Sequence, residues 1–348
     1  MKKLKNNDTV AIISLSSGLL GESFCLEQKL LAEKRLKELN LNFVYTPNAL
    51  KGIDYLEKNP QKRAEDLIWA FENKNIKAII CALGGFDTYK TLEFILNNKK
   101  NIKTLQKNKK IFVGYSDTTV NHLMLNKLKI KSFYGIALLT CIAEWDKEIL
   151  DYTKSSINWL FNINKPKEYT ISEYWYKERK TFGFENKNIP REKYKEEHGY
   201  ELLQGKAKFS GILLGGCLES IFSLLEKQNN NEIDKNYWIL DNKTFKNKVL
   251  LLETSEEKLE PEIIKNQLEY LKKYNIFSNV KAVIIGKPQD EKYYLEYKNL
   301  FKTFFSDPYF KNIPVLYNIN IGHAYPKMIL KLNSKIKVDF LKSKIKSY

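Results

Sequence analysis

The chain has 348 residues, and its 58 Lys and Arg against 41 Asp and Glu give a formal net charge of +17. Hydrophobic residues make up 43% of the sequence and aromatic residues 13%, a globular composition that argues against extended disorder. The length suffices for two ordinary domains, and no stretch reaches the roughly 20 apolar residues of a membrane-spanning helix.

A surplus of positive charge permits attraction to nucleic acid or to anionic membranes. The lysines are nevertheless spread along the chain in short clusters among asparagine and isoleucine, and no nucleic-acid-binding motif accompanies them. We therefore expect a solvated basic surface with no nucleic-acid or membrane partner. A nucleic-acid-binding protein stays as an alternative, which a steep salt dependence of binding would support.

Four cysteines lie far apart, at Cys25, Cys81, Cys141 and Cys217. None has the spacing of a zinc site, and we expect them to be small buried residues and the protein to hold no metal. The N-terminus begins with basic residues but lacks the apolar region and cleavage site of a secretory signal peptide. Both observations predict a cytoplasmic protein.

The first third of the chain alternates between strand-like and helix-like segments. Predicted strands lie at residues 9–15, 41–45, 76–83 and 110–114, and predicted helices at 22–39, 61–73, 88–96 and 118–128. This alternation predicts an α/β domain with a doubly wound parallel sheet of the flavodoxin or amidotransferase type. Ligands are expected beyond the carboxyl ends of its strands, where Gly84-Gly85 and the segment 114–117 lie.

From about residue 162 to residue 200 the pattern dissolves into charged and aromatic residues, which we interpret as a linker or a loop that covers the site. Its aromatic residues Tyr174 and Trp175 are candidates either for packing or for substrate contact.

The remaining chain predicts a mixed β/α domain, with the lysine-rich C-terminal tail as an exposed strand end. Its predicted strands lie at 205–214, 248–253, 280–286, 315–319 and 328–332, and its predicted helices at 218–226, 262–274 and 293–305. The predicted boundaries are 1–160 for the N-terminal domain, 161–203 for the linker and 204–348 for the C-terminal domain.

Ser116 follows a predicted buried strand and directly precedes a predicted helix. A serine on such a sharp turn presents its hydroxyl at the sheet edge, near the amides of a helix N-terminus, and Gly114 permits the tight turn. The motif is Gly-x-Ser-Asp rather than the full Gly-x-Ser-x-Gly of a nucleophile elbow. The local sequence leaves open the alternative that Ser116 or Asp117 only caps the following helix.

A serine nucleophile needs a base, usually a histidine oriented by a carboxylate. His122 falls inside the predicted helix after the serine and is expected to be structural, and His198 falls in the polar linker. His323 follows Gly322 in a loop at a strand end, where this architecture places working residues. We therefore favour His323 as the base.

The orienting carboxylate is expected at a strand end. Glu253 closes the apolar run Val-Leu-Leu-Leu-Glu, where a charged residue has to be exposed, paired or functional. Asp290 and Glu291 compete with it for this role. The chain order Ser116, Glu253, His323 is also the order found in α/β-hydrolases.

Acyl transfer also requires hydrogen-bond donors for the developing oxyanion. A backbone N–H of Gly84-Gly85 and the N–H of Asp117 are the candidates. An ordinary strand-to-helix turn is the alternative interpretation of the glycine pair.

Several segments together resemble the serine LD-carboxypeptidase family, which includes the microcin C self-immunity peptidases. The matching segments, in family order, are residues 63–67, 84–85, 114–119, 211–216, 251–254, 286–290 and 322–323. Their joint occurrence over almost the entire chain is far more specific than any single motif.

This resemblance implies a nucleophilic Ser116, an acidic Glu253 and a base His323, with the backbone amides of Gly85 and Asp117 as the oxyanion hole. It also implies hydrolysis of an amide-type bond through an acyl-enzyme, a homodimer, a site between the two domains, and no metal or organic cofactor.

The substrate implied by the resemblance is a small peptide or an aminoacyl nucleotide. Cell-wall-recycling members commonly carry an arginine before the glycine pair, whereas this chain has Leu83 before Gly84. The glycine pair, residues 286–290 and the loop with Tyr174 and Trp175 are more similar to the microcin-immunity branch, where an aromatic loop stacks on a nucleotide base. Gly84, Tyr174 and Trp175 are therefore candidate substrate-binding residues. A non-catalytic α/β ligand-binding module is the alternative, favoured if the three triad candidates lie far apart.

Overall fold

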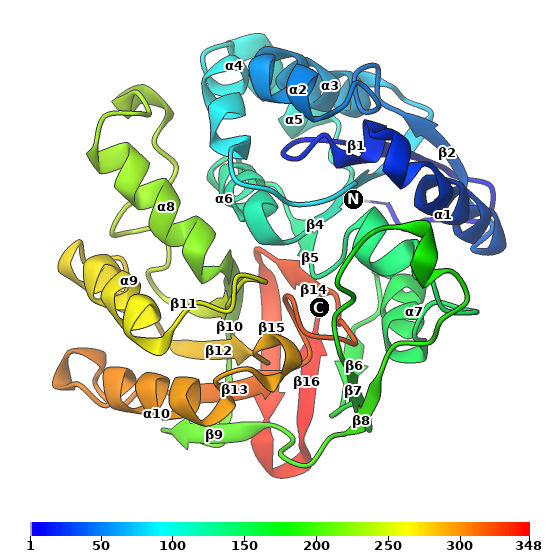
Figure 1. Cartoon of the computed structure of the whole chain (residues 1–348). Helices are drawn as coiled ribbons and strands as arrows, with labels where there is room; N and C mark the ends of the chain where they lie inside the picture. Colours follow the sequence, from blue (N-terminus) through cyan, green and yellow to red (C-terminus); the bar gives the residue numbers. More distant parts are fainter. Residues whose placement is uncertain (1) are drawn as a thin grey trace.

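The computed structural model describes residues 2–348 and contains two large sheets and one two-stranded ribbon (Figure 1). The first sheet has the order β14-β5-β4-β3-β1-β2. Its strands are β1 (Thr9–Ile13), β2 (Asn42–Tyr45), β3 (Ile76–Cys81), β4 (Ile111–Gly114), β5 (Ser132–Tyr134) and β14 (Leu330–Leu332). All neighbouring strands pair in parallel except β14, which runs antiparallel to β5.

Helices cover both faces of the first sheet. They are α1 (Leu26–Glu38), α2 (Ile53–Lys58), α3 (Pro60–Glu72), α4 (Leu92–Leu96), α5 (Lys99–Lys107), α6 (Thr119–Lys127) and α7 (Asp151–Asn158). Because side chains alternate along a strand, Val10 and Ile12 belong to the core beneath α1, whereas Ala11 and Ile13 belong to the core beneath α3. The predicted doubly wound parallel sheet is confirmed.

The second sheet is mixed and has the order β6-β16-β15-β10-β11-β12-β13-β9. Its strands are β6 (Lys167–Tyr169), β9 (Glu201–Gln204), β10 (Lys208–Cys217), β11 (Lys248–Glu253), β12 (Ala282–Gly286), β13 (Val315–Ile319), β15 (Ser334–Asp339) and β16 (Lys344–Ser347). Strands β10 to β13 are parallel and the others pair antiparallel. The predicted mixed β/α region is confirmed.

Three helices line one side of the second sheet, as Figure 1 shows: α8 (Leu218–Asn229), α9 (Pro261–Lys273) and α10 (Tyr294–Phe305). Their apolar residues share a core with the side chains of Leu250 and Leu252 on β11. The opposite face of β11, through Val249 and Leu251, packs in a core that also contains Tyr134 of the first sheet. The two sheets therefore meet through packed side chains.

The chain does not pass from one sheet to the other at a single point. Strand β14, from the C-terminal region, joins the first sheet, and β6 joins the second. The predicted domain boundaries near residues 160 and 203 stay predictions. Within 162–200, where no regular pattern was predicted, β6 and the ribbon of β7 (Tyr174–Tyr176) and β8 (Lys193–Lys195) form.

The expectation of an exposed C-terminal strand end is wrong. Strand β16 pairs on one side with β15 and on the other with β6, and Ile345 is fully buried.

Strand β10 also runs on through Gly215-Gly216, which were predicted to follow it. A Cβ at Gly216 would lie 2.4 Å from Thr119 Oγ1, so only glycine lets this strand approach α6 closely.

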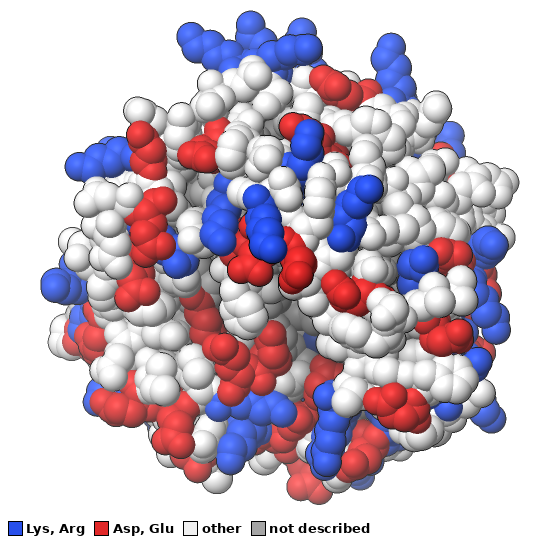
Figure 2. Space-filling view, turned by 45° about the horizontal axis from the view of Figure 1, so that its top comes forward, with Lys and Arg blue, Asp and Glu red and all other residues white. Residues whose placement is uncertain are grey.

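Lysines and acidic residues are interspersed over the face drawn in Figure 2. This mixture agrees with the solvated basic surface expected from the sequence. None of the helices within residues 2–348 is both long enough and apolar enough to cross a membrane.

Candidate active site

Ser116 occupies a strained turn between β4 and α6. Its backbone φ is +63°, a left-handed conformation that non-glycine residues rarely adopt and that clusters at functional sites. A Cβ at Gly114 would lie 2.5 Å from Thr118 Oγ1, so the turn requires glycine there. Because Asp117 accepts its hydrogen bonds from Ser16 Oγ and the Thr88 N–H, it does not cap α6. The turn has the features of a nucleophile elbow.

The glycine pair after β3 lies against this turn. A Cβ at Gly84 would lie 2.8 Å from Ser116 Cβ, 2.9 Å from Ser116 Oγ and 3.4 Å from Asp117 N. At Gly85 an added Cβ would lie 2.3 Å from Ser16 Oγ. The backbone of Gly84 therefore approaches Ser116, and that of Gly85 approaches Ser16, more closely than a residue with a side chain allows.

Glu253 and His323 form a buried pair. His323 Nδ1 lies 2.7 Å from Glu253 Oε2, and the Glu253 side chain is wholly inaccessible to solvent. Gly322 makes room for the carboxylate, because a Cβ there would lie 2.3 Å from Glu253 Oε2. The two competing acids are engaged elsewhere: Asp290 accepts the Glu178 N–H, and Glu291 pairs with a lysine.

Tyr134 joins the serine turn to the acid. Its hydroxyl donates to Glu253 Oε1 at 2.6 Å and accepts the Ser116 N–H at 3.1 Å. A chain of hydrogen bonds thus runs from the Ser116 backbone through Tyr134 and Glu253 to His323. Sequence reasoning missed Tyr134, although it ends a short apolar run just before a glycine.

The other ring nitrogen of His323 faces a second acid. His323 Nε2 lies 2.7 Å from Glu256 Oε2, and the Glu256 side chain is 49% exposed. Burial opposes the charge on the ring, but Glu253 and Glu256 outweigh it and raise the pKa of His323 to about 10. Burial also opposes ionisation of Glu256, but the contact with His323 prevails and lowers the pKa of that carboxyl to about 2. The ring is therefore protonated in this arrangement, and Glu256 has to leave Nε2 before that nitrogen can accept a proton from Ser116.

The other two histidines lie elsewhere. His122 is fully buried, with Nδ1 2.7 Å from Ser132 Oγ and Nε2 3.1 Å from the Gly114 carbonyl. Burial lowers its pKa to about 4. His198 is exposed and stacks on Tyr294 at 4.1 Å. His122 is a structural residue, as the sequence predicted.

A cavity of about 660 Å³ brings the catalytic candidates together. Ser116, His323, Gly84 and Gly85 all line it, as does Glu256. Tyr174 and Trp175 do not: Trp175 stacks on Tyr194 at 4.4 Å, and the Tyr174 ring lies 3.6 Å from Lys193 Nζ. Their contact with substrate stays a prediction.

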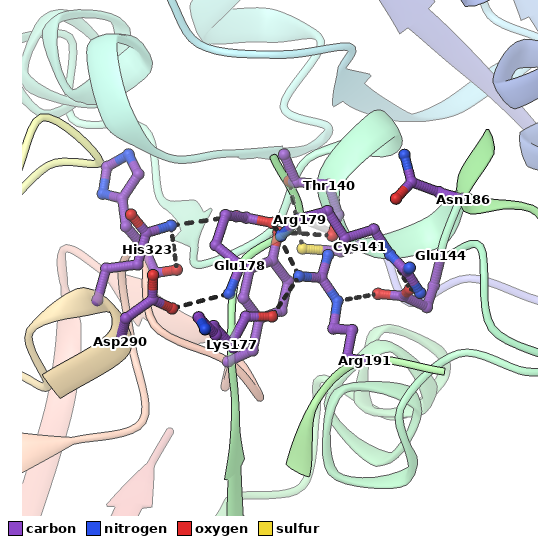
Figure 3. A network of polar contacts seen from close by, with 12 residues as sticks. Thr140, Cys141, Glu144, Lys177, Glu178, Arg179, Asn186, Arg191, Asp290 and His323 are labelled. Atoms are coloured by element: carbon purple, nitrogen blue, oxygen red, sulfur yellow. Dashed lines mark hydrogen bonds and ion pairs between the residues drawn. The ribbon is translucent and has the colours of Figure 1, made fainter. Parts of the chain in front are cut away.

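The segment between β7 and β8 supplies one wall of the cavity through other residues (Figure 3). Arg191 donates to Glu144 at 2.6 Å and to Glu178 at 2.8 Å, and Arg179 also donates to Glu144 at 2.8 Å. Burial opposes the charge of Glu144, but the two guanidinium groups outweigh it and lower the pKa of this carboxyl. The charges of Glu144, Glu178, Arg179 and Arg191 are therefore compensated within the protein, which fixes this part of the wall.

Family models match both halves of the chain. The LD-carboxypeptidase N-terminal domain matches residues 10–135, and the LD-carboxypeptidase C-terminal domain matches residues 210–338. The chain belongs to the LD-carboxypeptidase family of peptidases. The resemblance found in the sequence motifs is thereby confirmed.

Relatives of this peptidase include proteins named MccF or MccF-like and proteins named carboxypeptidases. The structure of an MccF-like protein from Streptococcus pneumoniae in complex with AMP is 41% identical, with a TM-score of 0.90, and the match covers 97% of this chain and 98% of that one. A probable murein peptide carboxypeptidase of Bacillus subtilis is 28% identical over 96% of this chain and 89% of its own length.

The microcin C7 self-immunity protein MccF of Escherichia coli is 25% identical over 80% of this chain and 76% of its own length. A structure of the microcin C7 self-immunity protein MccF in complex with aspartyl sulfamoyl adenosine has the same fold, with a TM-score of 0.79 at 21% identity over 99% of this chain and 97% of that one.

Proposed function

We propose that this peptidase hydrolyses an amide-type bond with a triad of Ser116, His323 and Glu253 through an acyl-enzyme. The observation that carries the proposal is that His323, which pairs with the buried Glu253 at 2.7 Å, lines the same cavity as the strained Ser116. The alternative that Ser116 only caps a helix does not account for its position. The alternative of a non-catalytic module would be favoured if the three residues lay far apart, and they do not.

In the proposed reaction His323 Nε2 takes the proton of Ser116 Oγ, and Oγ attacks the carbonyl carbon of the scissile bond. The amides of Gly85 and Asp117 donate hydrogen bonds to the oxyanion, and loss of one such donor typically costs about 10²–10³ in rate. The imidazolium then protonates the leaving nitrogen as the C–N bond breaks. A water molecule, deprotonated by His323, then attacks the acyl carbon, and the imidazolium returns its proton to Ser116 Oγ as the ester C–O bond breaks.

We propose as substrate a small peptide or an aminoacyl nucleotide, and the observations favour the nucleotide. The relative that is 41% identical binds AMP, and the cavity of about 660 Å³ lies in the size range of small-ligand pockets. The murein peptide carboxypeptidase among the relatives supports a muropeptide as the second candidate.

Incubation with leucyl sulfamoyl adenosine and, separately, with an LD-linked muropeptide tests this proposal, with products separated by chromatography and identified by mass. We expect release of leucine from the nucleotide by the wild-type protein and none by Ser116→Ala. Equal turnover by both proteins would overturn the role of Ser116, and cleavage of the muropeptide alone would reverse the substrate preference.

We further propose a homodimer that works in the cytoplasm. All four cysteines are free and buried, which is compatible with a reducing compartment. Light scattering tests the assembly, with an expected mass of twice the chain mass of 40.9 kDa. A particle of single-chain mass at working concentration would contradict the dimer.

A further inference from the structure

Ser116 borders a second, smaller cavity in addition to the large one. The second cavity has a volume of about 260 Å³ and shares Gly85, Phe86, Ser116 and Glu256 with the large cavity. At about 30 Å³ per water molecule this is room for about nine water molecules, enough for one extended amino-acid side chain. A substrate whose carbonyl carbon lies at Ser116 therefore has space on two sides, and its smaller part fits the second cavity.

The second cavity is acidic although the chain as a whole is basic. Its acidic lining residues are Asp117, Glu219, Glu226, Glu256 and Glu257. Among the described residues that line it, Lys227 is the one basic residue. The Lys227 ammonium group is already paired with Glu232 at 3.2 Å and lies 4.7 Å from the centre of the Tyr89 ring. Figure 2 shows acidic side chains bordering the hollow near the centre of that face.

A residue with a buried, unpaired hydrogen-bond acceptor also lines this cavity. Gln267 on α9 lines the cavity and is only 8% exposed, and its side-chain oxygen has no hydrogen-bond partner within residues 2–348. A buried acceptor without a partner is costly, so a ligand that donates a hydrogen bond to it is stabilised. Carboxylates and an amide oxygen together call for a ligand that is both positively charged and rich in donors. A primary ammonium group, with three N–H donors and no acceptor, has this chemistry.

We propose that the second cavity is a subsite for a primary ammonium group carried by the acyl residue of the substrate. This inference rests on the proposed function, because the acyl residue is defined by attack of Ser116 on its carbonyl carbon. The ammonium group belongs either to a lysine-like side chain or to the α-amino group of the acyl residue. An acidic side chain, such as that of an aspartyl ligand, meets like charge in this cavity.

Binding to the Ser116→Ala protein tests the subsite without turnover. The ligands are sulfamoyl adenosines that carry lysyl, Nα-acetyl-lysyl, norleucyl, Nα-acetyl-norleucyl or aspartyl groups, and calorimetry measures each Kd. We expect the ligands with an ammonium group and no acidic side chain to bind at least about tenfold more tightly than Nα-acetyl-norleucyl, the gain typical of a charge-assisted contact. Tight binding of Nα-acetyl-lysyl assigns the side chain as the source, and tight binding of norleucyl assigns the α-amino group. Equal affinities across the panel, or tightest binding of the aspartyl ligand, would overturn the proposal.

A matched pair of variants separates local recognition from general electrostatics. Glu226→Gln/Glu257→Gln removes two carboxylates of the cavity, and Glu262→Gln/Glu269→Gln removes two exposed carboxylates of α9 outside it. We expect only the first pair, in the Ser116→Ala background, to reduce the ammonium preference, by about threefold or more. An equal reduction by both pairs would contradict the subsite.

Turnover of the neutral norleucyl ligand by the wild-type protein reports on the proposed function separately. Ammonium-selective binding without any turnover means that the proposed function fails and the subsite stands. Turnover that ignores the charge of the acyl residue means that the function stands and the subsite fails.

Discussion

The two halves of the active site are held in different ways. The half that carries Ser116 is determined by backbone geometry: a left-handed serine at a strand end, with Gly84 packed against it. The half that carries His323 is determined by side-chain hydrogen bonds, with Glu253 on one ring nitrogen and Glu256 on the other. The first half therefore tolerates little change in shape, whereas the second responds to loss of charge or of a hydrogen bond.

Replacement of Ser116 by alanine should have the largest effect. The nucleophile is lost while the packing of the turn is retained, so we expect kcat to fall by about 10⁴-fold or more with little change in the free energy of unfolding. Single-turnover kinetics and urea denaturation measure the two quantities. Retention of more than a tenth of the activity would remove Ser116 from the mechanism.

Gly84→Ala tests whether shape governs the half that carries Ser116. The new Cβ would lie 2.8 Å from Ser116 Cβ, so the serine has to move, and we expect a loss of about 10²-fold in kcat. Gly211→Ala is the matched control, because its Cβ would lie 2.9 Å from Val249 Cγ2, away from the catalytic residues. If both variants retain normal kcat values, the close approach at Gly84 has no catalytic role.

Tyr134→Phe tests the link between the halves. It removes the hydroxyl that donates to Glu253 and accepts the Ser116 N–H, so we expect about tenfold lower kcat and a loss of about 1–3 kcal/mol in the free energy of unfolding. Tyr169→Phe removes a buried hydroxyl that donates to the Ile329 carbonyl. The control should lose comparable stability at unchanged kcat; an equal fall in kcat would mean that Tyr134 acts only through stability.

Glu256→Gln should have the smallest effect, confined to the pH dependence of kcat/KM. Catalysis needs neutral His323, so activity of the free enzyme should rise with pH toward the pKa of about 10 that Glu253 and Glu256 impose. Removal of the Glu256 charge lowers that pKa, and the acidic limb of the profile should move to lower pH. Glu262→Gln, at an exposed position, should leave the profile in place. An unmoved limb in Glu256→Gln would show that Glu256 does not hold His323 in solution.

The sequence predicted best the elements with an uninterrupted apolar run. Strands β11 and β13 have the predicted bounds. The apolar residues before Glu253 on β11 are buried on both faces, so the sequence shows a continuous apolar run that ends at Glu253. Helix α5 was missed because Leu105 is its single buried residue, which leaves no apolar stripe to recognise.

The parts of the site that were missed depend on tertiary contacts. Strand β5, only three residues long, has too little pattern to predict, and Tyr134 acquires its role from Glu253, 119 residues away. Glu256 follows the predicted acid by three positions, yet only folding brings it to His323 Nε2. The C-terminal tail was predicted as a strand end, but its burial was missed, because β6, which covers the edge of β16 that β15 leaves open, lies far back in the chain.

The most direct test of the account is to trap and locate the acyl-enzyme. The protein is quenched in acid during turnover of leucyl sulfamoyl adenosine, digested, and sequenced by mass spectrometry. We predict a leucyl ester on Ser116 in the wild-type protein and its absence in His323→Ala. A leucyl adduct on another residue, or hydrolysis in ¹⁸O-labelled water with label entering leucine and no enzyme ester at any time, would contradict a Ser116 nucleophile.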